Sequence, residues 1–304
     1  MNTTDLRFRS NRVRDIIGLF HEELDSAYGS NETGVFVEML FEALLEWDRT
    51  RLMISKEETV NQSDLLRFHW ALEDLKKKRP IQHIIGYCDF CGCRIGVNPD
   101  VLIPRPETEE MVQWVIELIQ QNRQPRLSIL NSQFSILDLC TGSGCIAIAL
   151  KKAFPEATVS AVDISEAALE TARHNAGDNN VEINIHQADI LDSQFSIPNS
   201  QFSILISNPP YVRDSERKAM CANVLDYEPA MALFVPDEDP LRFYHAIAQI
   251  AQRQLAENGL LVVEINEALG EATCNLLRKH GFFPTLHTDF RGKKRFITAV
   301  KNNS

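Results

Sequence analysis

The chain has 304 residues, room for one large domain and a smaller one, and its 44% hydrophobic and 24% charged residues are a globular composition. A formal net charge of -11 argues against extended binding along nucleic acid, which needs a basic face. The longest apolar runs, such as Cys145–Leu150 and Leu260–Val263, are far shorter than the roughly 20 residues that cross a bilayer. Since the amino terminus also lacks the apolar core of a signal peptide, we expect a cytoplasmic protein without membrane attachment.

The seven cysteines, an odd number, indicate free thiols in a reducing compartment. Cys88, Cys91 and Cys93 have the spacing C-x-x-C-x-C, which is half of a metal knuckle. No second C-x-x-C and no nearby histidine pair completes four ligands in the sequence. We therefore expect these cysteines to be small buried side chains of a strand, and no metal is predicted.

Residues 11–79 repeat apolar side chains at helical spacing, interrupted by short polar segments. This pattern predicts a small helical domain over residues 1–85. Asn61 and Ser63 are both suitable caps for its third helix.

Residues 86–97 mix aromatic, Cys and Ile residues with glycines, which is typical of a short hairpin. We expect residues 86–100 to link the helical domain to a second domain. That second domain is predicted to occupy residues 101–304.

The second domain begins with a proline-containing segment. Pro104 and Pro106 favour an extended approach to a helix predicted over Met111–Gln121. Arg105 and the carboxylates of Glu107, Glu109 and Glu110 form either a cap network for that helix or part of the wall of a site, and their position favours the cap.

Strand and helix patterns then alternate to the end of the chain. Such alternation predicts a doubly wound, mostly parallel sheet, and the last two strands are expected to form an antiparallel hairpin at one edge. The predicted strands are Ile136–Cys140, Thr158–Val162, Ile183–His186, Ile204–Ser207, Leu260–Ile265, Phe282–Leu286 and Arg295–Val300, and the predicted helices are Ile146–Phe154, Glu166–Ala176, Leu241–Ala256 and Ala268–His280.

One heptapeptide occurs twice. Residues Asn131–Leu137 are identical to Asn199–Leu205, and Ser193–Ile197 repeats the middle of the motif. Both full copies lead directly into a predicted central strand, and we interpret the repeated residues as duplicated material that lengthens surface connections.

The first predicted strand of the sheet leads into a glycine-rich segment, Asp138–Gly144, called here the glycine loop. Glycines there allow the backbone to approach a ligand at a helix amino terminus. Gly142, Gly144 and Ala147 also satisfy the dinucleotide fingerprint, and Asp163 at the end of the next strand is placed to bind ribose hydroxyls. A nicotinamide enzyme is therefore one possible interpretation.

The acidic residues favour a different ligand. Asp138 would repel a pyrophosphate but suits the cationic amino-acid end of S-adenosylmethionine. Asp189, after the third strand, is placed to accept from an adenine amino group, with Ile190 beside the ring. Three acids at successive strand ends form an ordered series that surface capping alone does not predict.

A rigid polar turn, Asn208–Tyr211, follows the predicted strand Ile204–Ser207 and is called here the corner. Its two prolines fix φ and remove backbone donors. The Asn208 side-chain oxygen and the Pro209 carbonyl could each accept one N–H of a planar NH2 group, while Tyr211 packs on its face. A proline-stiffened turn without chemistry is the alternative.

The glycine loop and the corner together resemble the class I methyltransferases that modify planar nitrogens. With Leu102–Glu110, Tyr227–Leu233 and Glu264–Asn266 added, nearly the whole chain is similar to the HemK/PrmC family, the release factor glutamine methyltransferases. The resemblance implies a class I S-adenosylmethionine-dependent fold, Rossmann-like with a mostly parallel seven-stranded sheet, and an amino-terminal helical bundle that recognises the substrate.

The resemblance also implies the reaction, which is methyl transfer to the glutamine of the Gly-Gly-Gln loop in class 1 peptide chain release factors. A monomer is expected.

Cys140 stands where the family usually has glycine, so a positive φ there would strain the backbone. The donor-binding residues are expected to be Asp138, Thr141, Gly142, Ser143, Gly144, Asp163, Asp189, Ile190 and Asn208, the substrate-binding residues Asn208, Pro209, Pro210 and Tyr211, and the catalytic residues Asn208, Pro209 and Tyr211.

Other functions compete with this one. A methyltransferase for an exocyclic amine of adenine or guanine would use the same corner on a flipped base, and a ribosomal protein glutamine is another possible acceptor. A nicotinamide dehydrogenase would leave the corner without a role, and a binding module without activity would leave both motifs unexplained.

Overall fold

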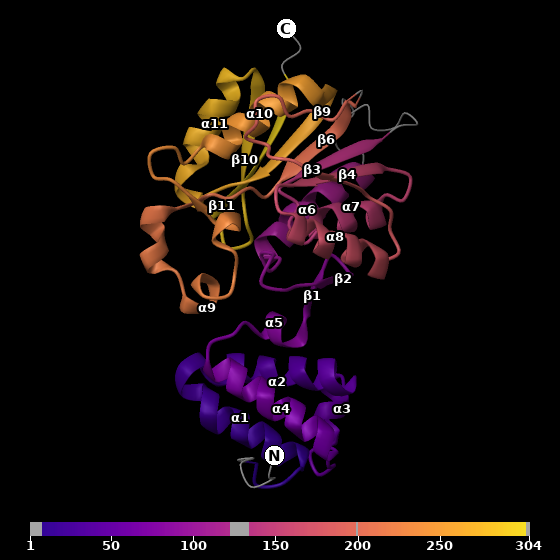
Figure 1. The fold of residues 1–304 in the computed structure, drawn as a ribbon, viewed down its shortest axis with the longest axis vertical. Helices are drawn as coiled ribbons and strands as arrows, with labels where there is room; N and C mark the ends of the chain where they lie inside the picture. The colour runs from indigo at the N-terminus through magenta and orange to yellow at the C-terminus, as the bar shows by residue number, and fades with distance from the viewer. Residues whose placement is uncertain (1–7, 122–133, 199, 302–304) are drawn as a thin grey trace. The chain divides into compact units, whose positions relative to one another are not determined.

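The computed structural model describes residues 8–121, 134–198 and 200–301, which form two compact units (Figure 1). One unit is helical and consists of Met1–Gly86 together with Ala222–Tyr227. The other contains the large sheet and consists of Tyr87–Cys221 and Glu228–Ser304. The short segment Ala222–Tyr227, distant in sequence from the helical unit, was not expected to join it.

The helical unit buries its apolar side chains around three aromatic rings. The Phe41 and Phe68 centroids are 4.5 Å apart, and Phe20 meets Phe68 edge to face at 6.4 Å. The helix predicted as the third is α4, because the short helix α3 precedes it. Asn61, rather than Ser63, caps it: the Asn61 side chain accepts from the backbone N–H of Asp64 at 2.8 Å. The helices are α1 (Val13–Tyr28), α2 (Ser30–Leu45), α3 (Arg49–Ile54), α4 (Gln62–Lys76), α5 (Ile81–Ile85) and, later in the chain, α9 (Ala222–Leu225).

The predicted hairpin is present as strands β1 (Tyr87–Phe90) and β2 (Cys93–Gly96), which pair antiparallel. It belongs to the unit with the large sheet. Phe90 and Ile95 are buried in the core of that unit, and the backbone N–H of Gly96 donates to Asn175 Oδ1 at 2.8 Å. The segment expected to act as a linker is therefore anchored on one side by its apolar residues.

The large sheet has seven strands in the order β10-β11-β9-β6-β3-β4-β5 (Figure 1). Strand β11 is antiparallel to both neighbours, and the five strands from β9 to β5 are mutually parallel, as the alternating pattern predicts. The strands are β3 (Ser135–Leu139), β4 (Thr158–Asp163), β5 (Asn184–Gln187), β6 (Phe202–Ser207), β9 (Leu255–Glu264), β10 (Phe282–Thr288) and β11 (Lys294–Lys301), with a separate short pair, β7 (Val212–Arg213) and β8 (Phe234–Val235).

Helices cover both faces of this sheet because side chains alternate along each strand. Ile136 and Ile204 pack in one apolar cluster with helices α6 and α7, whereas Leu137 and Leu205 pack in another with α10 and α11. Both faces are therefore buried, as expected for a parallel sheet. The helices are α6 (Pro106–Gln120), α7 (Cys145–Ala153), α8 (Glu166–Asp178), α10 (Arg242–Gln254) and α11 (Gly270–Lys279), with short 3-10 turns at Asp214–Ala219, Ala230–Ala232 and Glu267–Leu269.

The start of helix α6 differs from the prediction. The helix begins at Pro106, five residues before the predicted Met111. Proline is favourable at the first helical position, where its missing N–H has no partner to lose, and Glu107 and Glu109 complement the positive helix end. Thr108 consequently lies in the first helical turn with its side chain buried.

The two copies of the heptapeptide lie side by side in part. Ile136 pairs with Ile204 and Leu137 with Leu205 in the parallel strands β3 and β6, so equivalent residues of the two copies are in register. Residues 131–133 and 199 are outside the described residues. The repeat is thus more than loop material, because its apolar end forms the centre of the sheet.

Two kinds of feature are absent from the described residues. They contain no group of three or more His, Cys, Asp or Glu side chains that could hold a metal ion, and no helix both long and apolar enough to cross a membrane.

Burial raises the pKa of Cys88 and of Cys91 to about 12, so these thiols stay protonated at neutral pH.

Candidate active site

The glycine loop and the corner follow neighbouring strands at the point where the strand order of the sheet reverses. Strand β3 leads into the glycine loop and β6 into the corner, and Ser207 Oγ donates to the Leu139 carbonyl oxygen at 2.7 Å. Open α/β sheets bind ligands at such a reversal, beyond the carboxyl ends of the strands.

A cavity of about 240 Å³ lies there, with walls from the loops that follow strands β3, β4, β5 and β6. This is several times the roughly 30 Å³ that one water occupies. Of the residues predicted for the site, the cavity is lined by Thr141, Gly142, Ser143, Asp163, Asp189, Ile190, Asn208 and Pro210. The wall does not include Asp138, Gly144, Pro209 or Tyr211.

Asp138 lies behind the wall rather than in it. Its side chain is fully buried, and Oδ2 accepts from the Thr141 hydroxyl at 2.5 Å. Oδ1 has no hydrogen-bond partner of ordinary geometry among the described residues. Burial raises the pKa of Asp138 to about 7, although the Thr141 hydroxyl and the nearby Ala147 amide favour the ionised form. Asp138 therefore supports Thr141, which does line the cavity.

The backbone of the glycine loop is left-handed at three positions. Gly142 and Gly144 have φ of 53° and 80°, and Cys140 has φ of 59°. The positive φ on which the predicted strain of Cys140 depends is present, and such a conformation costs a non-glycine residue about 1–2 kcal/mol. Asp163 Oδ2 accepts from the Gly142 backbone N–H at 2.9 Å and holds the loop in this shape.

Gly144 also permits close packing. It caps the amino end of helix α7, and a Cβ there would lie 3.0 Å from Ala172 Cβ. A side chain at position 144 would therefore clash with helix α8. This steric limit explains why glycine is needed there although Gly144 does not line the cavity.

One end of the cavity combines acidic and apolar groups. Asp163 and Asp189 lie in the wall, and Asp189 Oδ1 accepts from the Leu191 backbone N–H at 2.8 Å. Ile190 is buried, whereas Ile164, also in the wall, is 46% exposed. Our sequence analysis missed Ile164, although an apolar residue directly after an acidic strand end was a usable signal.

The charges of the wall discriminate between ligands. Arg105 is in the wall, but its Nη2 lies 2.6 Å from Oε1 of the buried Glu228, which neutralises it. Arg105 is the N-cap residue of helix α6, as its position predicted, but its side chain makes no hydrogen bond to that helix. Asp100, Asp163 and Asp189 also line the cavity, and acidic residues in the wall favour a cationic ligand over a pyrophosphate.

The corner is held from behind by side chains that we did not predict for the site. Asn208 Nδ2 donates to Thr108 Oγ1 at 3.0 Å, and Thr108 Oγ1 donates to Glu264 Oε2 at 2.6 Å. The Tyr211 hydroxyl donates to the other oxygen, Glu264 Oε1, at 2.9 Å. Thr108 and Glu264 lie in segments that resemble the family, but nothing in their spacing indicated that they meet.

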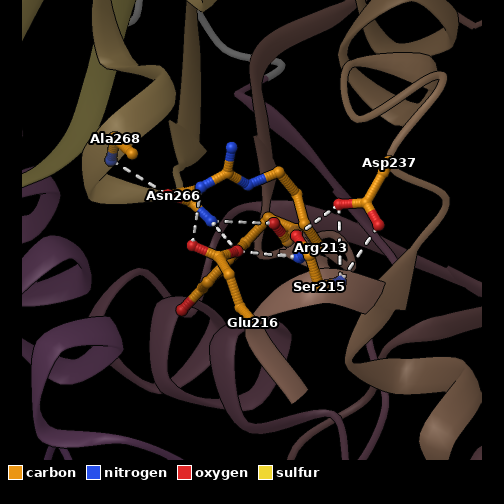
Figure 2. Close-up of polar contacts among 7 residues, drawn as sticks. Arg213, Ser215, Glu216, Asp237, Asn266 and Ala268 are labelled. Carbon is orange, nitrogen blue, oxygen red and sulfur yellow. Dashed lines mark hydrogen bonds and ion pairs between the residues drawn. The ribbon is translucent and has the colours of Figure 1, made fainter. Parts of the chain in front are cut away.

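Asn266, two residues after Glu264, holds the main chain of the corner. Its amide nitrogen donates to the Tyr211 carbonyl oxygen at 3.2 Å. The same nitrogen donates to Glu216 Oε2 at 2.8 Å, and Asn266 Oδ1 accepts from the Ala268 backbone N–H at 2.9 Å (Figure 2). The corner is thus fixed at both its side chains and its backbone.

Known proteins resemble this chain over most of its length. A release factor glutamine methyltransferase of Flavobacterium psychrophilum is 42% identical over 279 residues, which are 91% of this chain and 95% of that protein. The chain belongs to the release factor glutamine methyltransferase family. The family resemblance inferred from the sequence is thereby confirmed, and the chain is an S-adenosylmethionine-dependent methyltransferase by family.

Further matches agree with this membership. A family member of Bacteroides thetaiotaomicron is 43% identical over 74% of this chain and 77% of its own length, and one of Streptococcus pneumoniae is 34% identical over 88% and 90%. The family models "Methyltransferase small domain" and "PrmC N-terminal domain" match residues 124–231 and 20–86.

A solved structure supports the fold. The crystal structure of the hMettl16 catalytic domain in complex with the MAT2A 3′UTR hairpin 6 aligns with a TM-score of 0.52 and 14% identity. The alignment covers 80% of this chain and 83% of that one. At this identity the likeness shows the class I methyltransferase fold alone, and that fold prediction is confirmed.

Proposed function

We propose that this chain transfers a methyl group from S-adenosylmethionine to the side-chain amide nitrogen of the Gly-Gly-Gln glutamine in class 1 peptide chain release factors. The observation that carries the proposal is that the glycine loop and the corner contribute to one cavity. A donor on the loop and a planar amide at the corner would therefore meet within it.

The residues of the wall fit the methyl donor. Asp163 already accepts from the Gly142 and Ser165 backbone N–H groups, yet a carboxylate has further acceptor sites for two ribose hydroxyls. Asp189 has the acceptor chemistry for an adenine amino group, between the apolar Ile164 and Ile190. Thr141, supported by Asp138, would face the amino-acid end.

When bound, the donor supplies an electrophilic methyl group, and transfer breaks its S–C bond, returns that electron pair to sulfur, forms the N–C bond and releases one amide proton to solvent. An amide nitrogen is a weak nucleophile because its lone pair is delocalised. The corner compensates by accepting both amide hydrogens, one on Asn208 Oδ1 and one on the Pro209 carbonyl oxygen. Positive charge on the nitrogen is stabilised by the same two oxygens as it develops.

Tyr211 is proposed to hold the amide plane and Pro210 to keep the turn rigid, with φ fixed by its ring. A release factor is the proposed partner, and a cytoplasmic monomer that needs no metal remains our prediction. The helical unit is proposed to contribute to substrate recognition.

The test is transfer of labelled methyl from S-adenosylmethionine to three acceptors in parallel. They are a class 1 release factor, its Gly-Gly-Gln to Gly-Gly-Ala variant, and mixed nucleic acid. We expect label on the first acceptor alone. Label on nucleic acid alone would move the acceptor to a base amine, and label on the alanine variant would exclude the glutamine.

A further inference from the structure

Glu264 sets the direction of the hydrogen bonds behind the corner. Its side chain is fully buried at the end of strand β9, and its two oxygens accept from the hydroxyls of Thr108 and Tyr211 at 2.6 and 2.9 Å. Burial raises the pKa of Glu264, whereas the hydroxyls of Thr108 and Tyr211 and the charge of Arg295 favour its ionised form. In that form the carboxylate has no hydrogen to donate. Both hydroxyls therefore direct their single hydrogens to Glu264.

Thr108 can then act toward Asn208 only as an acceptor. Its oxygen lies 3.0 Å from the Asn208 amide, so the Asn208 group that faces it must be the N–H donor. The opposite orientation would place two lone pairs against each other. Asn208 Oδ1 is thereby turned away from Thr108, and none of the described residues donates to it.

We propose that Thr108 and Glu264 are positioning residues that lock the Asn208 carboxamide with its oxygen toward the acceptor nitrogen. This inference rests on the proposed function, in which Asn208 Oδ1 accepts an amide hydrogen of the substrate. A free asparagine could present either NH2 or oxygen there, and an NH2 group would repel the substrate NH2. The hydrogen-bond chain from Glu264 through Thr108 to Asn208, called here the relay, removes that ambiguity before the substrate arrives.

The negative charge of Glu264 also polarises the relay. Glu264, Thr108 and Asn208 form a chain of two hydrogen bonds in a buried environment, where each bond polarises the next. A negative group at its end makes Asn208 Oδ1 a stronger acceptor. Such an acceptor gains most when the substrate nitrogen becomes positive, so the relay acts on turnover more than on binding.

Tyr211 is held by the same carboxylate. Its hydroxyl donates to Glu264 Oε1, and the backbone carbonyl of Glu264 accepts from the Tyr244 hydroxyl at 3.0 Å. One buried residue therefore helps to fix both the amide and the ring of the corner.

The decisive variants differ in one hydroxyl group. Thr108→Val keeps the shape of the side chain and removes the acceptor for Asn208, whereas Thr108→Ser keeps the hydroxyl. Thr273→Val is the matched control, because Thr273 in helix α11 is also a buried threonine, its hydroxyl donates to the carbonyl oxygen of Leu269, the N-cap residue of that helix, and it lies outside the cavity wall. Thermal unfolding of each variant verifies that the protein is folded.

We expect Thr108→Val to lower kcat for release-factor methylation about 10- to 100-fold, with KM and the Kd for S-adenosylmethionine within about threefold. Thr108→Ser and Thr273→Val should keep kcat within about threefold of the unaltered protein. Equal kcat in Thr108→Val and Thr108→Ser would overturn the relay.

A second measurement needs no substrate. The side-chain amide signals of Asn208 in a ¹⁵N–¹H spectrum, assigned by their loss in Asn208→Ala, should show one hydrogen-bonded proton that Thr108→Ser retains and Thr108→Val loses. If the unaltered protein methylates no release factor, the proposed function fails. Unchanged Asn208 signals in Thr108→Val would separately overturn the positioning role.

Discussion

The glycine loop and the corner occupy the same edge of the sheet but are built by different means. The loop takes its shape from the backbone, with left-handed φ at Cys140, Gly142 and Gly144. The corner combines two φ-fixing prolines with contacts of the Asn208 and Tyr211 side chains to residues distant in sequence. Substitutions in the loop should therefore act mainly on stability and donor affinity, and those in the corner on turnover.

The largest effect is expected at the corner itself. Asn208→Ala removes an acceptor that strengthens in the transition state, and we expect kcat to fall about 10²- to 10³-fold. The Kd for S-adenosylmethionine, measured by calorimetry, should stay within about threefold, because Asn208 is only one residue of a wide wall. Near-normal turnover would show that the Asn208 side chain is not needed for methyl transfer and that only the backbone of the corner contributes.

The next effect is a pH-dependent stability of the loop. The pKa of about 7 for buried Asp138, against 3.8 for an ordinary aspartate, disfavours ionised Asp138 in the folded state by at most about 4 kcal/mol. The folded state binds the proton more tightly, so this penalty is absent below pH 4, grows as pH rises and is complete above about pH 7.

Asp138→Asn should thus stabilise the protein, by about 1–2 kcal/mol at pH 5 and more at pH 8. Urea unfolding at both pH values measures the difference, and Asp178→Asn, which removes an exposed carboxylate at the end of helix α8, is the control. A stability gain that does not grow with pH would contradict the burial of an ionisable Asp138.

A smaller effect separates conformation from contact within the loop. Gly142→Ala introduces a Cβ into open space at φ of 53°, whereas Gly144→Ala places one 3.0 Å from Ala172 Cβ at φ of 80°. We expect losses of unfolding free energy of about 1 and about 2–3 kcal/mol respectively. Equal losses in urea unfolding would mean that the packing against Ala172 relaxes freely.

The smallest effect concerns the strained cysteine. Cys140→Ala and Cys140→Gly both remove the thiol, and only the second relieves the left-handed conformation. Because glycine also loses more entropy on folding, we expect the glycine variant to be more stable than the alanine variant by about 0.5–1 kcal/mol. The reverse order in thermal unfolding would show that the loop is not strained at this position.

The local elements of the protein could be predicted from its sequence. Periodicity located the seven strands of the large sheet and the longer helices of both units, and the glycine spacing and the two prolines marked the two loops. It missed the short elements α3, α5, α9, β7 and β8, and it predicted strand β9 to start at Leu260, whereas the strand begins at Leu255, inside the predicted helix Leu241–Ala256. The start of helix α6 was predicted five residues late, because a proline pair was interpreted as extended chain when Pro106 in fact begins the helix.

What the sequence determined by itself were the motifs whose residues are adjacent, the glycine loop and Asn208–Tyr211, since their chemistry depends on local backbone geometry. Only the tertiary structure decided which side chains support them. Thr108, Asn208 and Glu264 are separated by 100 and 56 positions, the second being 264 − 208, and they meet because a helix start and two strand ends converge at one edge of the sheet. No local pattern encodes that convergence, because it depends on the order in which the strands pair.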